Sequence, residues 1–109
     1  MIQITTNNFS KEVETSEKPV LVDFWAAWCG PCKLMGPVFE DLSKEYEGKV
    51  TFAKLNVDEN QDIAAKFGVM SIPTLVMFKG GKENGRLVGF APKTVLKQKI
   101  EELSKKAGA

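Results

Sequence analysis

VLVDFWAAWCGPC, residues 20–32, is the stretch of this sequence that decides the fold. Its first six residues, Val20 to Trp25, are apolar apart from Asp23, as expected for a strand that is covered on both faces. Pro31 suits the first turn of a helix, and the residues from 33 to 46 continue as a helical pattern. The stretch therefore predicts a buried strand, a tight turn and a helix in direct succession.

Both cysteines of the chain, Cys29 and Cys32, lie at the start of that predicted helix. Their spacing brings the two sulfurs within bonding reach, so the pair can alternate between a dithiol and a disulfide. A cysteine at a helix N-terminus faces unpaired N–H groups and the positive end of the helix dipole, which favour the nucleophilic thiolate. The alternatives are two structural thiols or half of a metal site. A tetrahedral metal site needs about four good ligands, and this chain offers two sulfurs and no histidine.

The bulk composition describes one ordinary globular domain over residues 1–109, with 43% hydrophobic and 27% charged residues. The formal net charge of +1 gives no reason to expect nucleic acid or an anionic membrane as a partner. No apolar stretch approaches the length of a membrane span, and residues 1–5 lack the pattern of a signal peptide. We therefore expect a cytoplasmic protein, in which a C-x-x-C pair is more often catalytic than structural.

Strand and helix patterns alternate along the rest of the chain. The expected strands cover residues 2–4, 20–25, 50–57, 74–79 and 85–90, the last two forming a hairpin around the turn 80–84. The expected helices begin at a cap at Ser10, at Pro31, at a cap at Asp58 or Asn60, and at Pro92. In the second of these helices, Val38, Leu42 and Tyr46 are spaced to face the sheet. This order predicts the α/β class, with a mixed sheet and helices on both of its faces.

Asp23 is the single charged residue within the apolar strand 20–25. Strand alternation places it on the same face as Leu21 and Trp25. The alternative is an edge strand from which Asp23 reaches water, but the apolar neighbours favour burial. Burial raises the pKa of a carboxyl group towards the neutral range, so Asp23 is a candidate acid and base.

The sequence resembles the thioredoxin family over essentially its whole length. The resemblance is carried by WCGPC after VLVDFWA, by Lys54, by Ser71-Ile72-Pro73-Thr74 and by Val88-Gly89. It implies the thioredoxin fold, a single mixed central sheet flanked by helices on both faces. It also implies the activity of a general protein-disulfide reductase and electron carrier.

The family resemblance assigns roles to the candidate catalytic residues. Cys29 would be the exposed thiolate that attacks a substrate disulfide, and Cys32 the sheltered thiol that resolves the mixed disulfide. Asp23 would relay a proton to and from Cys32, through water. Lys54 would lie near Asp23 and moderate its charge, whereas the sequence by itself equally suits an exposed lysine whose stem packs on the sheet.

The resemblance also implies a substrate-binding surface. Pro73 would follow a cis peptide bond, and the backbone of Ile72 would pair with an extended substrate segment. Apolar or small residues would complete the surface: Trp28, Gly30, Pro31, Val88, Gly89 and Phe90. Taken singly, each of these residues also suits core packing or a turn. Gly36, Met70 and Phe90 differ from the residues usual in the family, and the last two could alter the rim of the surface.

The chain has no glycine-rich dinucleotide fingerprint, so we expect no bound flavin, nicotinamide or metal. By resemblance, a separate thioredoxin reductase would supply the chain with electrons from NADPH. The chain itself would be a monomer. Its substrates would be disulfide-containing proteins such as ribonucleotide reductase, peroxiredoxins and methionine sulfoxide reductase. The alternatives are an oxidant or isomerase, which typically carries histidine between the cysteines, a glutaredoxin, which typically carries Pro-Tyr there, and a binding subunit without turnover.

Overall fold

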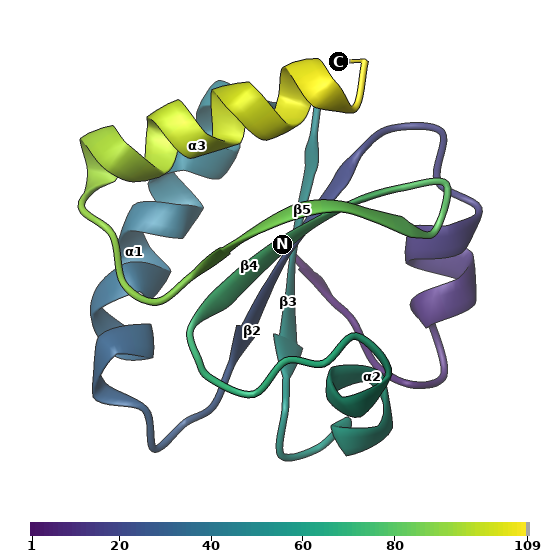
Figure 1. Ribbon diagram of the computed structural model, residues 1–109, viewed down its shortest axis with the longest axis vertical. Helices are drawn as coiled ribbons and strands as arrows, with labels where there is room; N and C mark the ends of the chain where they lie inside the picture. Colours follow the sequence, from purple (N-terminus) through teal and green to yellow (C-terminus); the bar gives the residue numbers. More distant parts are fainter. Residues whose placement is uncertain (109) are drawn as a thin grey trace.

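The computed structural model describes residues 1–108 and contains a five-stranded mixed sheet in the order β1-β3-β2-β4-β5 (Figure 1). The strands are β1 (Ile2–Gln3), β2 (Val20–Trp25), β3 (Thr51–Asn56), β4 (Thr74–Lys79) and β5 (Lys82–Val88). The helices are the short π-helix η1 (Ser10–Glu14), α1 (Gly30–Glu45), α2 (Gln61–Lys66) and α3 (Lys93–Lys106). β1 and β2 run parallel to β3, and β4 runs antiparallel to β2 and β5. The expected fold class and element order are confirmed.

β2 is the central strand, and its alternating side chains enter two separate cores. Leu21 packs with α1 and α3 on one face, whereas Val22 and Phe24 pack with η1 and α2 on the other face. Figure 1 shows these two pairs of helices on opposite sides of the sheet. β2 therefore has neighbouring strands on both edges and helices on both faces, as its apolar sequence predicts.

The residues of α1 that face the sheet differ in part from those that the sequence spacing predicted. Met35 and Phe39 are fully buried, and Leu42 and Tyr46 are buried as expected, but Val38 is only partly buried. Several residues of α1 are apolar, and the packing of the helix against the sheet places position 39 rather than 38 in the core.

The strand bounds differ from the expected ones by one residue at β1 and at each end of β3, and the larger differences concern η1 and β5, which ends at Val88. Ser10 is the first residue of η1 and not its cap, because Phe9 occupies the cap position. The turn between β4 and β5 uses only Gly80 and Gly81, with φ angles of 61° and 80°. Two residues with positive φ close a hairpin without further loop, so β5 begins at Lys82 and not at residue 85.

The middle of β5 lies close against α3. A Cβ atom at Gly85 would overlap Cδ2 of Leu103, and the φ angle of 155° at Gly85 is one that other residues rarely adopt. The glycine therefore permits the close approach of α3 to the edge strand.

Within residues 1–108, no helix has both the length and the apolar character needed to cross a bilayer.

Candidate functional site

The two cysteines lie where β2 passes into α1. Cys29 is the N-cap of α1 and Cys32 lies in its first turn, and a disulfide joins them across a Cα–Cα distance of 5.3 Å. The turn before the helix is closed by a hydrogen bond from the Cys29 amide to the Ala26 carbonyl, 3.2 Å long. Pro31 occupies the first helical turn, where its missing N–H leaves no helical bond unmade. Gly30 and Pro31 are both exposed.

The sulfur of Cys29 accepts a hydrogen bond from the amide of Cys32, with a distance of 3.3 Å. This amide is one of the donors that a helix start leaves unpaired, so the interaction favours negative charge on Cys29. The expected difference in exposure between the two sulfurs is wrong for this disulfide form, because Cys29 and Cys32 are each only 4% exposed. Ala26 belongs to the same buried cluster as the two cysteines, and Trp25, Val57 and Ile72 pack against that cluster.

Asp23 is buried in β2, the strand that leads to the disulfide turn, and is 1% exposed. Neither carboxylate oxygen has a hydrogen-bond partner among the described residues. Loss of hydration raises the pKa of Asp23 from 3.8 to about 6, and the positive charge of Lys54 opposes part of that rise. The expected burial is thus confirmed, and the carboxyl group changes its protonation near neutral pH.

Lys54 lies on β3 directly beside Asp23 in the strand register. Its ammonium group lies 4.6 Å from the centre of the Trp25 ring, a cation–π contact. No ion pair links it to Asp23 within residues 1–108, so it acts on the carboxylate through space. The expected proximity is confirmed, and Lys54 is partly buried rather than fully exposed.

A pocket of about 230 Å³ opens beside Cys32 and Lys54. Trp25, Lys33, Gly36, Pro37 and Glu40 complete its lining. Asp23 does not line this pocket, so the pocket brings solvent to Cys32 and Lys54 but not directly to the carboxylate. A second pocket, of about 530 Å³, is lined by the end of α1, by α3 and by the segments 17–19 and 48–50, and it contains none of the site residues predicted from the sequence.

The segment before β4 approaches the disulfide from the other side. Ile72 and Pro73 are joined by a cis peptide bond, as the resemblance implied. The carbonyl oxygen of Ile72 lies 3.9 Å from the sulfur of Cys29. Two hydrogen bonds hold this segment: Thr74 Oγ1 donates to the Ser71 carbonyl at 2.6 Å, and the Gly89 amide donates to the Pro73 carbonyl at 2.8 Å. The backbone of Ile72 therefore lies next to the sulfur of Cys29.

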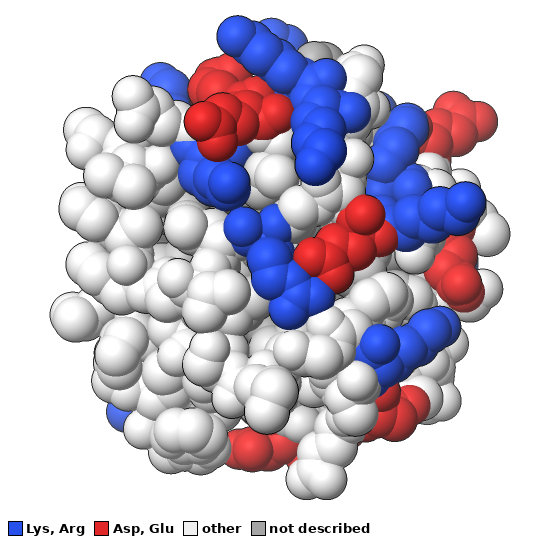
Figure 2. All heavy atoms as spheres, viewed as in Figure 1, with Lys and Arg blue, Asp and Glu red and all other residues white. Residues whose placement is uncertain are grey.

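Large apolar side chains are exposed around the disulfide. Trp28, Met70, Val88 and Phe90 are between 50% and 96% exposed, and Gly89 lies half-buried between the last two. Figure 2 shows almost no charged side chains on the side of the molecule that carries the start of α1 and the loop from β5 to α3. Such apolar surface is typical of a site that contacts other proteins. We call Trp28, Met70, Ile72, Val88 and Phe90 the docking surface.

Some residues at the site were not predicted from the sequence. Asp58 Oδ2 accepts a hydrogen bond of 2.9 Å from the indole nitrogen of Trp28 and so orients its ring. Leu34, on the exposed side of α1, is 68% exposed and extends the apolar surface. A leucine outside the apolar stripe of a helix is a sequence signal for such exposure, but no local pattern links Asp58 to a tryptophan 30 positions earlier.

These features define a class of protein: an oxidoreductase in which a pair of cysteines at the start of a helix alternates between dithiol and disulfide, beside an exposed apolar surface. No group of three or more metal-ligating side chains occurs in the part of the chain that the structure describes.

Comparison with known proteins gives the family. The thioredoxin family profile matches residues 1–102. Thioredoxin from Chlorobaculum thiosulfatiphilum is 53% identical over 100 residues, which cover 92% of this chain and 93% of the relative. Thioredoxin 1 from Nostoc sp. strain PCC 7120 is 49% identical over 100 residues, covering 92% and 94%. Thioredoxin from Alicyclobacillus acidocaldarius is 50% identical over 100 residues, which cover 92% of this chain and 94% of the relative. The chain belongs to the thioredoxin family and is a protein-disulfide oxidoreductase.

Proposed function

We propose that the chain reduces disulfides in other proteins by two thiol exchanges, with Cys29 as the attacking sulfur and Cys32 as the resolving sulfur. The hydrogen bond from the Cys32 amide to the Cys29 sulfur carries this assignment, because it stabilises negative charge on Cys29. No matching donor to the sulfur of Cys32 occurs among the described hydrogen bonds. The exposure of the two residues does not distinguish them.

In the first exchange, the Cys29 thiolate attacks one sulfur of the substrate disulfide. A bond forms between Cys29 and that sulfur, and the other substrate sulfur leaves as a thiolate. In the second exchange, Cys32 loses its proton and attacks Cys29, which releases the remaining substrate sulfur. The substrate gains two electrons, and its two thiolates take up two protons, one that balances the proton lost by Cys32 and one from water. The protein is left with the disulfide between Cys29 and Cys32.

We propose that Asp23 takes the proton of Cys32 during the second exchange. Its pKa of about 6 suits a group that accepts a proton at neutral pH. Proton transfer between Asp23 and Cys32 runs through water that enters beside Cys32, where the pocket of about 230 Å³ opens. Lys54 adjusts the proton affinity of Asp23 by its positive charge and does not touch the reacting sulfurs.

Substrate binding uses the docking surface. We propose that an extended substrate segment lies between Trp28 and the Val88–Phe90 loop and pairs with the backbone of Ile72. Its disulfide then meets Cys29, because the Ile72 carbonyl lies 3.9 Å from the Cys29 sulfur. The exposed apolar side chains of this surface favour substrates with apolar residues beside their disulfide.

Trapping of the mixed disulfide tests the assignment of the sulfurs. Cys32→Ser can attack but not resolve, so it should accumulate mixed disulfides with a protein substrate such as insulin. Cys29→Ser cannot attack and should form almost none. Alkylation of the reduced wild-type protein at neutral pH should modify Cys29 first. If Cys29→Ser were the variant that trapped insulin, the two roles would be reversed.

For the electron supply, we propose a separate NADPH-dependent flavoenzyme, thioredoxin reductase, acting in the cytoplasm. The chain itself would carry neither flavin nor nicotinamide. Proteins that form catalytic disulfides, including ribonucleotide reductase, peroxiredoxins and methionine sulfoxide reductase, are its proposed substrates. A strongly reducing potential against an NADPH-linked couple supports this direction of flow, and an oxidising potential would overturn it. Absence of insulin reduction with a matching reductase would favour a binding subunit.

A further inference from the structure

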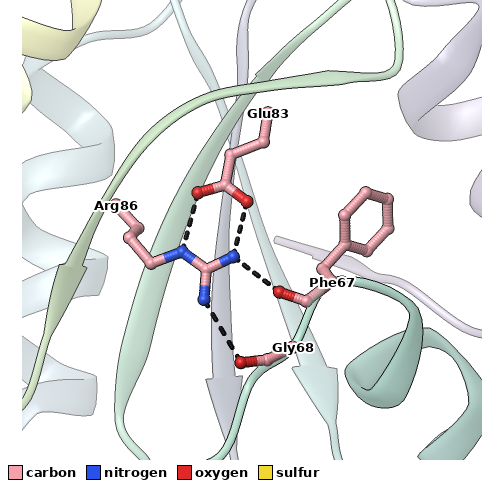
Figure 3. Close-up of polar contacts among 4 residues, drawn as sticks. All are labelled: Phe67, Gly68, Glu83 and Arg86. Carbon is pink, nitrogen blue, oxygen red and sulfur yellow. Dashed lines mark hydrogen bonds and ion pairs between the residues drawn. The ribbon is translucent and has the colours of Figure 1, made fainter.

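The side chain of Arg86, on β5, binds the backbone at the end of α2, at Phe67 and Gly68 (Figure 3). Its guanidinium forms a bidentate pair with the Glu83 carboxylate, with an Nε–Oε2 distance of 2.7 Å and an Nη2–Oε1 distance of 2.5 Å. The same guanidinium donates from Nη2 to the Phe67 carbonyl at 2.6 Å and, at the long limit of 3.5 Å, from Nη1 to the Gly68 carbonyl. Four interactions thus fix one side chain that is 27% exposed.

The two carbonyls lie at the end of α2. Gly68, with a φ angle of 62°, ends this helix, and its amide and that of Val69 bond back to the carbonyls of Ala65 and Ala64. The carbonyls of Phe67 and Gly68 lie beyond the last of those helix-end bonds. They accept hydrogen bonds from the Arg86 guanidinium instead. Because α2 has only six residues, it is too short to be stable alone and depends on contacts such as this one.

The segment that follows Gly68 leads directly to the docking surface. It contains Met70, which is 96% exposed, and ends at Ile72 beside the Cys29 sulfur. Its far end is held by the hydrogen bond between the Gly89 amide and the Pro73 carbonyl. Its near end is held to β5 by Arg86. Since β5 ends at Val88 and the chain then runs to Phe90, Arg86 ties together two chain segments that both contribute residues to the docking surface.

We propose that Arg86 is a positioning residue for substrate binding, which holds the segment 68–72 at a fixed place relative to the Val88–Phe90 loop. This inference rests on the proposed docking role of that surface. Without the guanidinium, the carbonyls of Phe67 and Gly68 pair with water, and the segment occupies further conformations. The apparent affinity for substrate then falls in proportion to the fraction of molecules that keep the binding conformation.

The test compares Arg86→Met with Arg86→Lys and with Lys82→Met. Arg86→Met keeps the bulk of the stem but removes all four interactions, whereas Arg86→Lys keeps the charge and can bind one carbonyl at a time. Lys82→Met is the matched control, because Lys82 is an exposed cation on the same strand whose side chain makes no hydrogen bond or ion pair within residues 1–108. Each variant is assayed with insulin and with a small aromatic disulfide that needs no docking surface.

For Arg86→Met, we expect the KM for insulin to rise by about three- to tenfold, with kcat and the rate with the small disulfide changed by less than about twofold. Arg86→Lys should recover part of the loss, and Lys82→Met should match the wild type. Equal losses with both disulfides, or an insulin KM equal to that of Lys82→Met, would overturn the proposal.

Hydrogen exchange separates this proposal from the proposed function. In Arg86→Met, amides of residues 68–72 should exchange faster, while those of β2 and β4 should keep their wild-type rates. Unchanged exchange in this segment would refute the positioning role even if insulin reduction were normal. If the wild-type protein did not reduce insulin, the proposed function would fail, and the exchange rates would still decide whether Arg86 holds the segment.

Discussion

Replacement of Asp23 by asparagine tests the burial of the carboxylate directly. The folded pKa of Asp23 is about 6 and its ordinary value is 3.8. Each tenfold change in proton affinity corresponds to about 1.4 kcal/mol, so the ionised carboxylate should cost the folded protein about 3 kcal/mol relative to the protonated form. Asp23→Asn is neutral at every pH and avoids this cost, while it buries a polar group of nearly the same shape.

The sign of the effect follows from proton binding. Between pH 3.8 and about 6, the folded protein binds more protons at Asp23 than the unfolded chain, so wild-type stability from this group falls as the pH rises. Below that window the cost is absent, and above it the full cost is present. The stability of Asp23→Asn relative to the wild type should therefore rise through the window and level off above about pH 6.

Urea unfolding of the disulfide forms at intervals from pH 3.5 to 8 measures this difference. Subtracting the wild-type free energy of unfolding from that of Asp23→Asn at each pH removes the contribution of the other titrating groups. Asp41→Asn, which replaces an exposed carboxylate, serves as the control. A pH-independent offset between wild type and Asp23→Asn is expected as well, because the amide is also buried without a partner. A difference that stayed constant from pH 3.5 to 8 would show that Asp23 is not desolvated, and would remove the basis for its proton transfer.

Three further substitutions test single features of the structure. Lys54→Met removes the positive charge that lowers the pKa of Asp23, so the Asp23 titration followed by carbon NMR should move above pH 6; a midpoint that stays in place would exclude the through-space effect. Gly85→Ala forces a Cβ against Leu103 and should lower the free energy of unfolding by about 1–3 kcal/mol in urea titrations, and full retention of stability would contradict the close packing of α3 on β5. Gly36→Ala adds a Cβ in the α1 interior that meets only Lys54 Nζ, at an ordinary contact distance of 3.9 Å, and should raise the melting temperature through a gain of about 0.5–1 kcal/mol; a loss would reveal a packing conflict.

The parts of the fold that follow a periodic pattern could be predicted from the sequence. The apolar run of β2 has the bounds expected for it, because a central strand needs apolar residues on both faces. Asp23 was predicted for the same reason, since one carboxylate in such a run has no route to water. The rotation of α1 was not predicted, because several residues on that helix are apolar and only the contact with the sheet selects Phe39 over Val38.

The parts of the site that join distant segments could not be predicted from local sequence. The hydrogen bond from Trp28 to Asp58 and the contact of Arg86 with Phe67 bring together residues that lie far apart in the sequence and share no periodic pattern. The shielding of Cys29 has the same origin, because Ile72 packs against the sulfur from a segment 43 positions later. Sequence spacing gives the order of residues at the helix start, but their exposure depends on which other loop covers them.

The position of β2 at the centre of the sheet has a consequence during synthesis of the chain. The strands on its two edges, β3 and β4, are both made after it, and β4 ends only at Lys79. A nascent chain that already presents Cys29 and Cys32 outside the ribosome cannot yet pair β2 with β4, so the contacts that cover the sulfurs form late. Until about fifty more residues have emerged, the two thiols should be as open to oxidants as those of an unfolded peptide.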